Sequence, residues 1–137
     1  MYAAARTFAE SYHRVHVETG TQAADPHKLI EMLLQGAIDA INQARGALER
    51  KDIKVKGEQI GKAVRIVEEG LRASLDATAG GRIASELDQL YAYIVRKLTL
   101  ANVRNDDQAM MECVQLLTPI CDAWAGIRPS VGSGRPQ

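Results

Sequence analysis

Few residues of this chain have the types and spacing that metal or acid–base chemistry requires. Glu10 and His13 form one Glu-x-x-His pair, whereas a di-metal site in a helical bundle needs two such pairs facing inward from different helices. His13 and His16 lie three residues apart, a spacing that surface histidines also show by chance. His27 follows a proline in the first turn of an expected helix, where a structural or surface role is favoured. No metal site and no cofactor are therefore expected.

The cysteines and glycines form no catalytic or phosphate-binding motif either. Cys113 and Cys121 are separated by about 12 Å along one expected helix, which is too far for a disulfide between them. Their spacing also lacks the paired cysteines of a zinc site, so we expect two reduced thiols in the core. Gly80-Gly81 lacks the following Gly and Lys of a phosphate-binding loop. The chain is not expected to be an enzyme.

Length and charge restrict the class of protein further. The 137 residues fit one domain, and Lys plus Arg equals Asp plus Glu at 17 each. Because there is no basic excess, binding to nucleic acid is not expected. No apolar run approaches the roughly 20 residues that cross a bilayer, so no membrane insertion is expected. The N-terminus has no uninterrupted apolar segment of secretory type, which predicts residence in the cytoplasm.

Four amphipathic segments predict an all-α fold, an antiparallel up-and-down four-helix bundle. The first three expected helices cover residues 26–50, 52–80 and 83–107, and the last follows the Asn105-Asp106 break and ends at Ile127. Pro26 begins the first helix with Asp25 as its N-cap, and Asp52 caps the second. Gly80-Gly81 and Asn105-Asp106 are the later breaks. The bundle domain is expected to span 1–127, with a cap and loop at 1–24, and 128–137 to form a flexible tail.

The third segment carries more apolar surface than one buried face requires. Its main stripe recurs at three- and four-residue steps and is formed by Ile83, Leu87, Leu90, Ile94, Leu98 and Ala101. Tyr91, Val95 and Asn102 lie on a flank beside that stripe, whereas Leu100 and Val103 point nearly away from it. The segment is therefore either a central helix with neighbours on two sides or a helix whose second neighbour is another protein.

Two residues of the last segment predict local features of its structure. Pro119 lies within its apolar stripe, where a proline removes a backbone hydrogen bond and is expected to kink the helix. Trp124 lies on the same stripe as Met110 and Leu117, close to the end of the bundle. We therefore expect Trp124 to be a core residue.

Six motifs follow one another along the chain. They are Asp25-Pro26-His27-Lys28-Leu29-Ile30-Glu31-Met32-Leu33 with Gly36-Ala37, Lys56-Gly57-Glu58 with Leu71 and Leu75-Asp76, Gly80-Gly81, Leu90-Tyr91-x-Tyr93, Ala101-Asn102-x-Arg104-Asn105-Asp106, and Ala123-Trp124. An early Tyr12-x-x-Val15-x-Val17-Glu18 accompanies them. In this order they resemble the flagellin-specific export chaperones of the FliS family, over nearly the whole of residues 1–127. The chain departs from that pattern at Pro119 and at Thr7-Phe8-Ala9-Glu10, where it is longer.

The resemblance implies a cytoplasmic chaperone for type III flagellar export. Members of that family bind the C-terminal segment of flagellin, which otherwise drives filament polymerisation, and keep it competent for export. Contact with the flagellar export gate is also implied. The expected state is a monomer or a weak homodimer. The alternatives are a structural bundle that self-associates without a flagellin client, and a four-helix protein that binds a metal or another ligand.

Seven residues of the expected helices are predicted to form the flagellin-binding groove. They are Ile38, Ile66, Gly70, Tyr91, Val95, Leu98 and Asn102. The competing interpretation is that these residues pack inside the bundle. The N-terminal segment is expected to cover the empty groove, because it is apolar yet too short and irregular for a stable helix. The residues of this cap are Tyr2, Phe8, Tyr12, Val15 and Val17.

Overall fold

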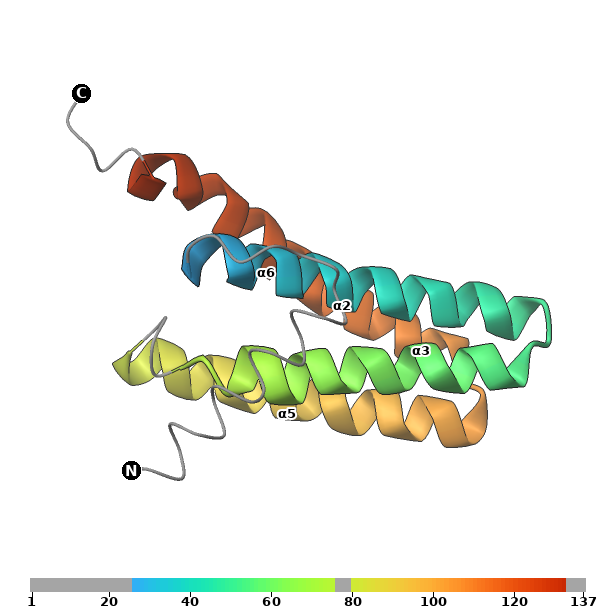
Figure 1. Cartoon of the computed structure of the whole chain (residues 1–137). Helices are drawn as coiled ribbons and strands as arrows, with labels where there is room; N and C mark the ends of the chain where they lie inside the picture. The colour runs from blue at the N-terminus through green and yellow to red at the C-terminus, as the bar shows by residue number, and fades with distance from the viewer. Residues whose placement is uncertain (1–25, 76–79, 133–137) are drawn as a thin grey trace.

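Four antiparallel helical rods make up the part of the chain that the computed structural model describes, residues 26–75 and 80–132, with side-chain surroundings as far as Ile127 (Figure 1). The elements are α2 (Pro26–Glu49), α3 (Ile53–Arg65), the π-helix η1 (Ile66–Arg72), α5 (Gly81–Arg104) and α6 (Asp107–Gly132). Because α3 continues directly into η1, these two elements form one rod. The predicted all-α four-helix bundle is confirmed. The expected N-terminal cap lies outside the described residues.

The helices begin and end at residues that favour termini. Pro26 is the first residue of α2, where its missing N–H costs nothing. The Asp52 carboxylate accepts a hydrogen bond of 3.2 Å from the Val55 amide and so caps α3. Gly81 and Asn105 adopt positive φ angles of 56° and 52°, at the start of α5 and just after its end. The predicted breaks between the helices are therefore confirmed.

The rods surround one core in the order α2, α3 with η1, α5 and α6. Each packs against its two neighbours in this order, so α2 and α5 lie at opposite corners. Ten residues of α2 are buried but only four of α5. The buried residues of α5 are Tyr91, Ile94, Leu98 and Ala101. The third segment, α5, has neighbours on two sides, namely α3 with η1 and α6, but α2 rather than α5 contributes most to the core.

The course of α6 explains why α5 is less buried than its sequence pattern suggests. The first half of α6 contacts α5, since the Cys113 thiol lies 3.9 Å from the Ile94 carbonyl oxygen. The second half contacts α2, where the Cys121 thiol lies 3.8 Å from Oε1 of Gln35. Pro119 lies between these two regions and within a continuous helix. Figure 1 shows the C-terminal half of α6 beside the start of α2 and away from the start of α5.

Two further features differ from the predictions. The π-helix η1 interrupts what was expected to be a regular helix from Asp52 to Gly80, and no local sequence feature explains it. The last helix continues to Gly132, so its expected end at Ile127 is wrong. Residues that lack an apolar period can still extend a helix that is already formed, because extension avoids the cost of nucleation.

Candidate functional site

Apolar side chains remain partly uncovered where α5 and α6 separate. Ile83 is 61 % exposed, and no residue between Gly81 and Leu90 is buried. Leu87 and Leu90 on α5, and Leu116 and Ile120 on α6, are half-buried against the core. We call these five residues, Ile83, Leu87, Leu90, Leu116 and Ile120, the open-end surface. Apolar surface of this kind at a helix–helix junction can bind the apolar face of another protein segment.

Helical periodicity places the two halves of the open-end surface opposite each other. On α6, Glu112 touches α5, and positions 116 and 120 follow it at one-turn intervals on the same side. On α5, Leu87 and Leu90 precede the buried Ile94 on one stripe. The stripe therefore runs out of the core and onto the surface as the two helices diverge. The sequence indicated one continuous apolar stripe, but its first half, Ile83, Leu87 and Leu90, is not buried.

A depression of about 510 Å³ adjoins the first turns of α5. It is lined by Arg72, Leu75, Gly80, Gly81, Ala84, Ser85 and Asp88. The Arg72 guanidinium forms ion pairs of 2.8 Å with Asp88 and 3.0 Å with Glu68, which ties η1 to α5. The hydrogen bond to Asp88 raises the pKa of Arg72, with a smaller contribution from Glu68. Arg72 therefore joins η1 to α5 at Asp88, near the N-terminal end of α5.

Most of the residues expected to form the flagellin-binding groove lie in the core. The buried members are Ile38, Ile66, Gly70, Tyr91 and Leu98. Burial raises the pKa of Tyr91 to about 12. Val95 and Asn102 are half-buried on α5. In the described structure, only Val95 and Asn102 of this set are partly accessible to a partner without movement of a helix.

Asn102 takes part in a junction that joins two of the sequence motifs. The ammonium group of Lys56 donates a hydrogen bond of 2.9 Å to the Asn102 carbonyl oxygen and another to the Asn105 side chain. Lys56 is only 3 % exposed, so these bonds satisfy a buried cation at the C-terminus of α5. Gly57 lies beside the Asn102 side chain. This junction brings together Lys56-Gly57 and Asn102-x-x-Asn105, which belong to two of the sequence motifs.

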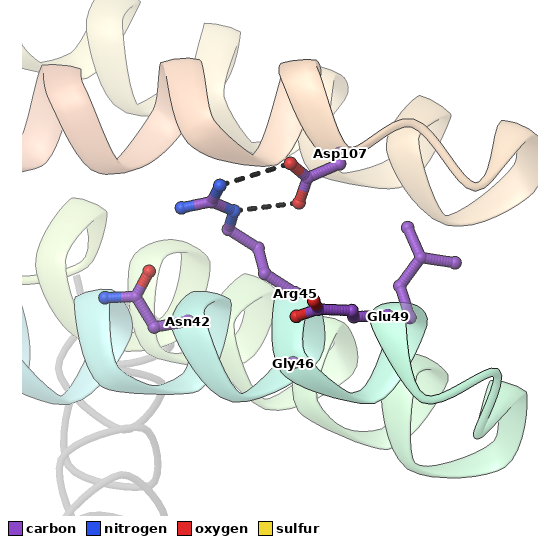
Figure 2. A pocket seen from close by; sticks show the side chains of 6 residues that line it. Asn42, Arg45, Gly46, Glu49 and Asp107 are labelled. Atoms are coloured by element: carbon purple, nitrogen blue, oxygen red, sulfur yellow. Dashed lines mark hydrogen bonds and ion pairs between the residues drawn. The ribbon is translucent and has the colours of Figure 1, made fainter.

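A second polar contact closes the same end of the bundle. Figure 2 shows the Arg45 guanidinium of α2 reaching the Asp107 carboxylate of α6, with two hydrogen bonds of 2.8 and 3.1 Å. The hydrogen bond from Arg45 holds the pKa of Asp107 below its ordinary value. The depression around this pair, about 610 Å³, is also lined by Asn42, Gly46, Leu48 and Glu49. The cation and the anion in this depression bind each other and join α2 to α6.

His27 and Trp124 join the start of α2 to the second half of α6. The indole N–H of Trp124 donates a hydrogen bond of 2.9 Å to the His27 carbonyl oxygen. In return, the His27 ring nitrogen Nε2 lies 3.0 Å from the Trp124 carbonyl oxygen, and the rings stack with centroids 4.7 Å apart. Trp124 is half-buried, so it is less enclosed than predicted, but it contacts the core.

The described residues offer no donor set for a metal. No three or more His, Cys, Asp or Glu side chains come together within 26–75 and 80–127 in a way that could hold an ion. His13 and His16 lie outside the described residues. Cys113 and Cys121 are free buried thiols, as predicted, and burial raises the pKa of Cys113 to about 12. Among the described helices, none has both the length and the apolar character to cross a membrane.

Two features of this region were not predicted from the sequence, the exposed start of the α5 stripe and the buried Lys56. The exposure of Ile83 and Leu87 depends on the direction of α6, which has no signal in the sequence of α5. Lys56 did have a signal, because it lies four residues before the buried Ile60 and therefore on the apolar stripe of α3. A lysine in that position indicates a cation that must find partners inside the bundle.

Comparison with known proteins gives one consistent result. Residues 8–131 match the family described as flagellar protein FliS. The flagellar secretion chaperone FliS of Salmonella typhimurium is 47 % identical over 120 residues, which cover 88 % of this chain and 89 % of that protein. The flagellar secretion chaperone FliSB of Pseudomonas aeruginosa is 42 % identical, with 86 % and 93 % covered. FliS of Vibrio cholerae is 40 % identical, with 88 % of each chain covered.

Proposed function

The chain belongs to the FliS family, and from this premise we propose that it is a cytoplasmic flagellar secretion chaperone whose client is the C-terminal segment of flagellin. In this role it keeps that segment from polymerising and hands it to the flagellar export gate. No catalytic step is involved. The observation that carries the proposal is the open-end surface, where the apolar stripe of α5 leaves the core.

An amphipathic client helix fits the open-end surface. Ile83, Leu87 and Leu90 repeat at four- and three-residue steps, the spacing that matches apolar residues on another helix. A client bound here covers the apolar stripe of α5 from Ile83 to Leu90, because α6 does not pack on this part of α5. We propose that the client also contacts Val95 and Asn102, which lie on the flank of α5 next to Gly57 of α3. The buried groove candidates Ile38, Ile66, Gly70, Tyr91 and Leu98 then support the surface from inside.

Charge substitution at the open end tests this function. The variant Leu87→Asp should fold, because Leu87 is only half-buried, but should bind a synthetic flagellin C-terminal peptide at least about tenfold more weakly. The matched control is Ile53→Asp, since Ile53 is also apolar and is 50 % exposed at the other end of the bundle. Isothermal titration calorimetry measures the affinities. Equal binding by wild type and Leu87→Asp contradicts the proposed surface.

Val95 distinguishes a surface role from a core role on α5. Val95→Asp should retain a cooperative melting transition and lose flagellin binding if the client contacts this side chain. If Val95 serves the core alone, a buried charge should instead abolish the transition. Size-exclusion chromatography of the wild-type protein with flagellin gives the broader answer. A 1:1 complex supports the chaperone, whereas a concentration-dependent homodimer without complex supports the self-associating bundle.

We further propose that the N-terminal segment covers the client surface when no client is bound. Tyr2, Phe8, Tyr12, Val15 and Val17 supply the apolar side chains for such a cap. Because the client must displace it, deletion of residues 1–17 should strengthen flagellin binding or leave it unchanged, and should increase self-association. Calorimetry and sedimentation velocity measure the two effects. Weaker binding after deletion contradicts a cap and indicates a clamp on the client.

A further inference from the structure

The outward side of α5 carries two exposed aliphatic residues that the proposed flagellin site does not use. Leu100 is 45 % exposed and Val103 is 76 % exposed, although both are large aliphatic residues on a bundle helix. At about 100° per residue, Arg96, Leu100 and Val103 fall within about 60° of one another around the helix. They point away from Ile94, Leu98 and Ala101, which are buried. We call Tyr93, Arg96, Leu100, Val103 and Arg104 the outer α5 face.

The outer α5 face is positively charged. No Asp or Glu occurs from Gln89 to Arg104, a stretch that contains Arg96, Lys97 and Arg104. Glu112 of α6 accepts a hydrogen bond of 2.6 Å from the Tyr93 hydroxyl and pairs with Lys97 at 3.4 Å. Asp106 and Asp107 follow Arg104 in the chain, where Asp106 accepts a hydrogen bond from the Ala109 amide and Asp107 binds Arg45. Arg96 lies 5.9 Å from the centre of the Tyr93 ring. Neither Arg96 nor Arg104 forms an ion pair with a carboxylate of the described residues.

From this combination we infer that the outer α5 face binds an acidic amphipathic helix of a second protein partner. Leu100 and Val103, one turn apart, offer apolar contacts to residues at the same spacing on the partner. Arg96 and Arg104 flank them, and each guanidinium can bind a carboxylate through two hydrogen bonds. The inference does not depend on the flagellin proposal, since the two surfaces lie on different sides of α5.

Charge distinguishes this occupant from other candidates. A symmetric pair of two copies through this face would bring arginines against arginines, which disfavours a homodimer. Anionic membranes are recognised by clusters of about four to eight Lys and Arg, more than this face presents. An acidic helix neutralises the few cations present and covers the two aliphatic side chains at the same time.

Synthetic peptides test the inference directly. The probe is an acidic amphipathic peptide of about 18 residues, with leucines along one face and glutamates beside them. The control peptide has the same composition in an order that destroys the amphipathic face. Fluorescence anisotropy should show that the probe binds at least about tenfold more tightly than the control, and that binding weakens as salt rises from about 50 to about 300 mM. Equal binding of the two peptides overturns the inference.

Protein variants locate the contact. The double variants R96E/R104E and L100S/V103S should each weaken binding of the probe by at least about tenfold, with unchanged melting temperatures because all four residues are exposed. Arg50→Glu makes the same charge change on an exposed residue at the end of α2 and should change the affinity for the probe by less than about twofold. Loss of probe binding in Arg50→Glu equal to that in R96E/R104E overturns the inference. Val103→Ser alone should still weaken binding measurably.

Three further outcomes decide between occupants. Flagellin peptide binding should be the same in R96E/R104E and wild type; a parallel loss assigns this face to the flagellin site and overturns a second partner. Binding to phosphatidylserine vesicles that disappears in R96E/R104E assigns the face to lipid and overturns a protein partner. Self-association in sedimentation velocity that disappears in L100S/V103S assigns the outer α5 face to a second copy of the chain and also overturns a second protein partner. If none of these three effects is seen and the probe binds more tightly than the control peptide, the results support an acidic helix as the occupant.

Discussion

Lys56 and Arg45 fix one end of the bundle by binding groups on helices distant in sequence. Lys56 lies at the start of α3 and bonds the end of α5, while Arg45 lies near the end of α2 and bonds the start of α6. Both contacts place a cation against a carbonyl or carboxylate oxygen at a helix terminus or first turn. Lys56 therefore joins α3 to α5, and Arg45 joins α2 to α6, at the same end of the bundle.

The Arg45–Asp107 contact predicts a specific dependence of stability on pH. The hydrogen bond from Arg45 lowers the pKa of Asp107 in the folded state. The ionised carboxylate therefore stabilises the fold fully above the pKa of an unfolded aspartate, about 3.9, and this stabilisation is lost as pH falls through the lower folded value. Asp107→Asn should therefore be less stable than wild type at about pH 7, and this difference should shrink towards pH 3. Urea unfolding at both pH values measures it.

Asp122 provides the control for that experiment. It is exposed on the same helix, so Asp122→Asn should change stability little at either pH. A difference between wild type and Asp107→Asn that stays constant from neutral to acidic pH contradicts a role for the charged carboxylate. In that case the shape of the side chain, rather than its ionisation, stabilises the start of α6.

At the scale of helices, the caps could be predicted from sequence and the burial of α5 could not. Asp52, Gly81 and Asn105 act on backbone groups within a few residues, so their types are sufficient to locate the termini. Ile83 and Leu87 continue a stripe that is correctly helical, but whether it is covered depends on where α6 lies. That position follows from contacts of α6 with α2, which no local pattern in α5 encodes.

The His27–Trp124 contact predicts the strength of the attachment between α2 and α6. Trp124→Phe retains an aromatic ring for stacking but removes the hydrogen bond to the His27 carbonyl oxygen, so it should cost about 0.5–1.5 kcal/mol. Trp124→Ala removes both contacts and should cost more, yet less than the roughly 3–5 kcal/mol of a fully buried aromatic residue. Urea unfolding followed by circular dichroism measures both. Equal stability of Trp124→Phe and wild type contradicts a role for the indole N–H.

For the molecule as a whole, the two ends of the bundle differ in how firmly they are held. At one end Lys56 joins α3 to α5 and the Arg45–Asp107 pair joins α2 to α6. At the other end His27 and Trp124 join α2 to α6 and Arg72 joins η1 to α5, but α5 and α6 diverge (Figure 1). Local opening is cheapest where few apolar side chains are buried. A surface that must accept a client and release it again is better placed at the end that opens more easily.

Hydrogen exchange tests this asymmetry along a single helix. Backbone amides of residues 84–90 should exchange faster than those of residues 94–101, because the first range has no buried side chain and the second includes Ile94, Leu98 and Ala101. Binding of the flagellin peptide should slow exchange in the first range more than in the second. Uniform protection along α5 in the free protein contradicts the proposed difference between the ends.

The two cysteines have a practical consequence for labelling experiments. Reagents such as maleimides react with the thiolate, and burial raises the pKa of Cys113 to about 12 and also raises that of Cys121. Both native thiols should therefore remain unmodified at neutral pH while the protein is folded. A cysteine introduced at an exposed position, such as Ile83→Cys or Val103→Cys, can then carry a spin label or dye in the otherwise native chain. Client-induced movement at either face of α5 becomes measurable as a distance, with both original sulfur atoms left in the core.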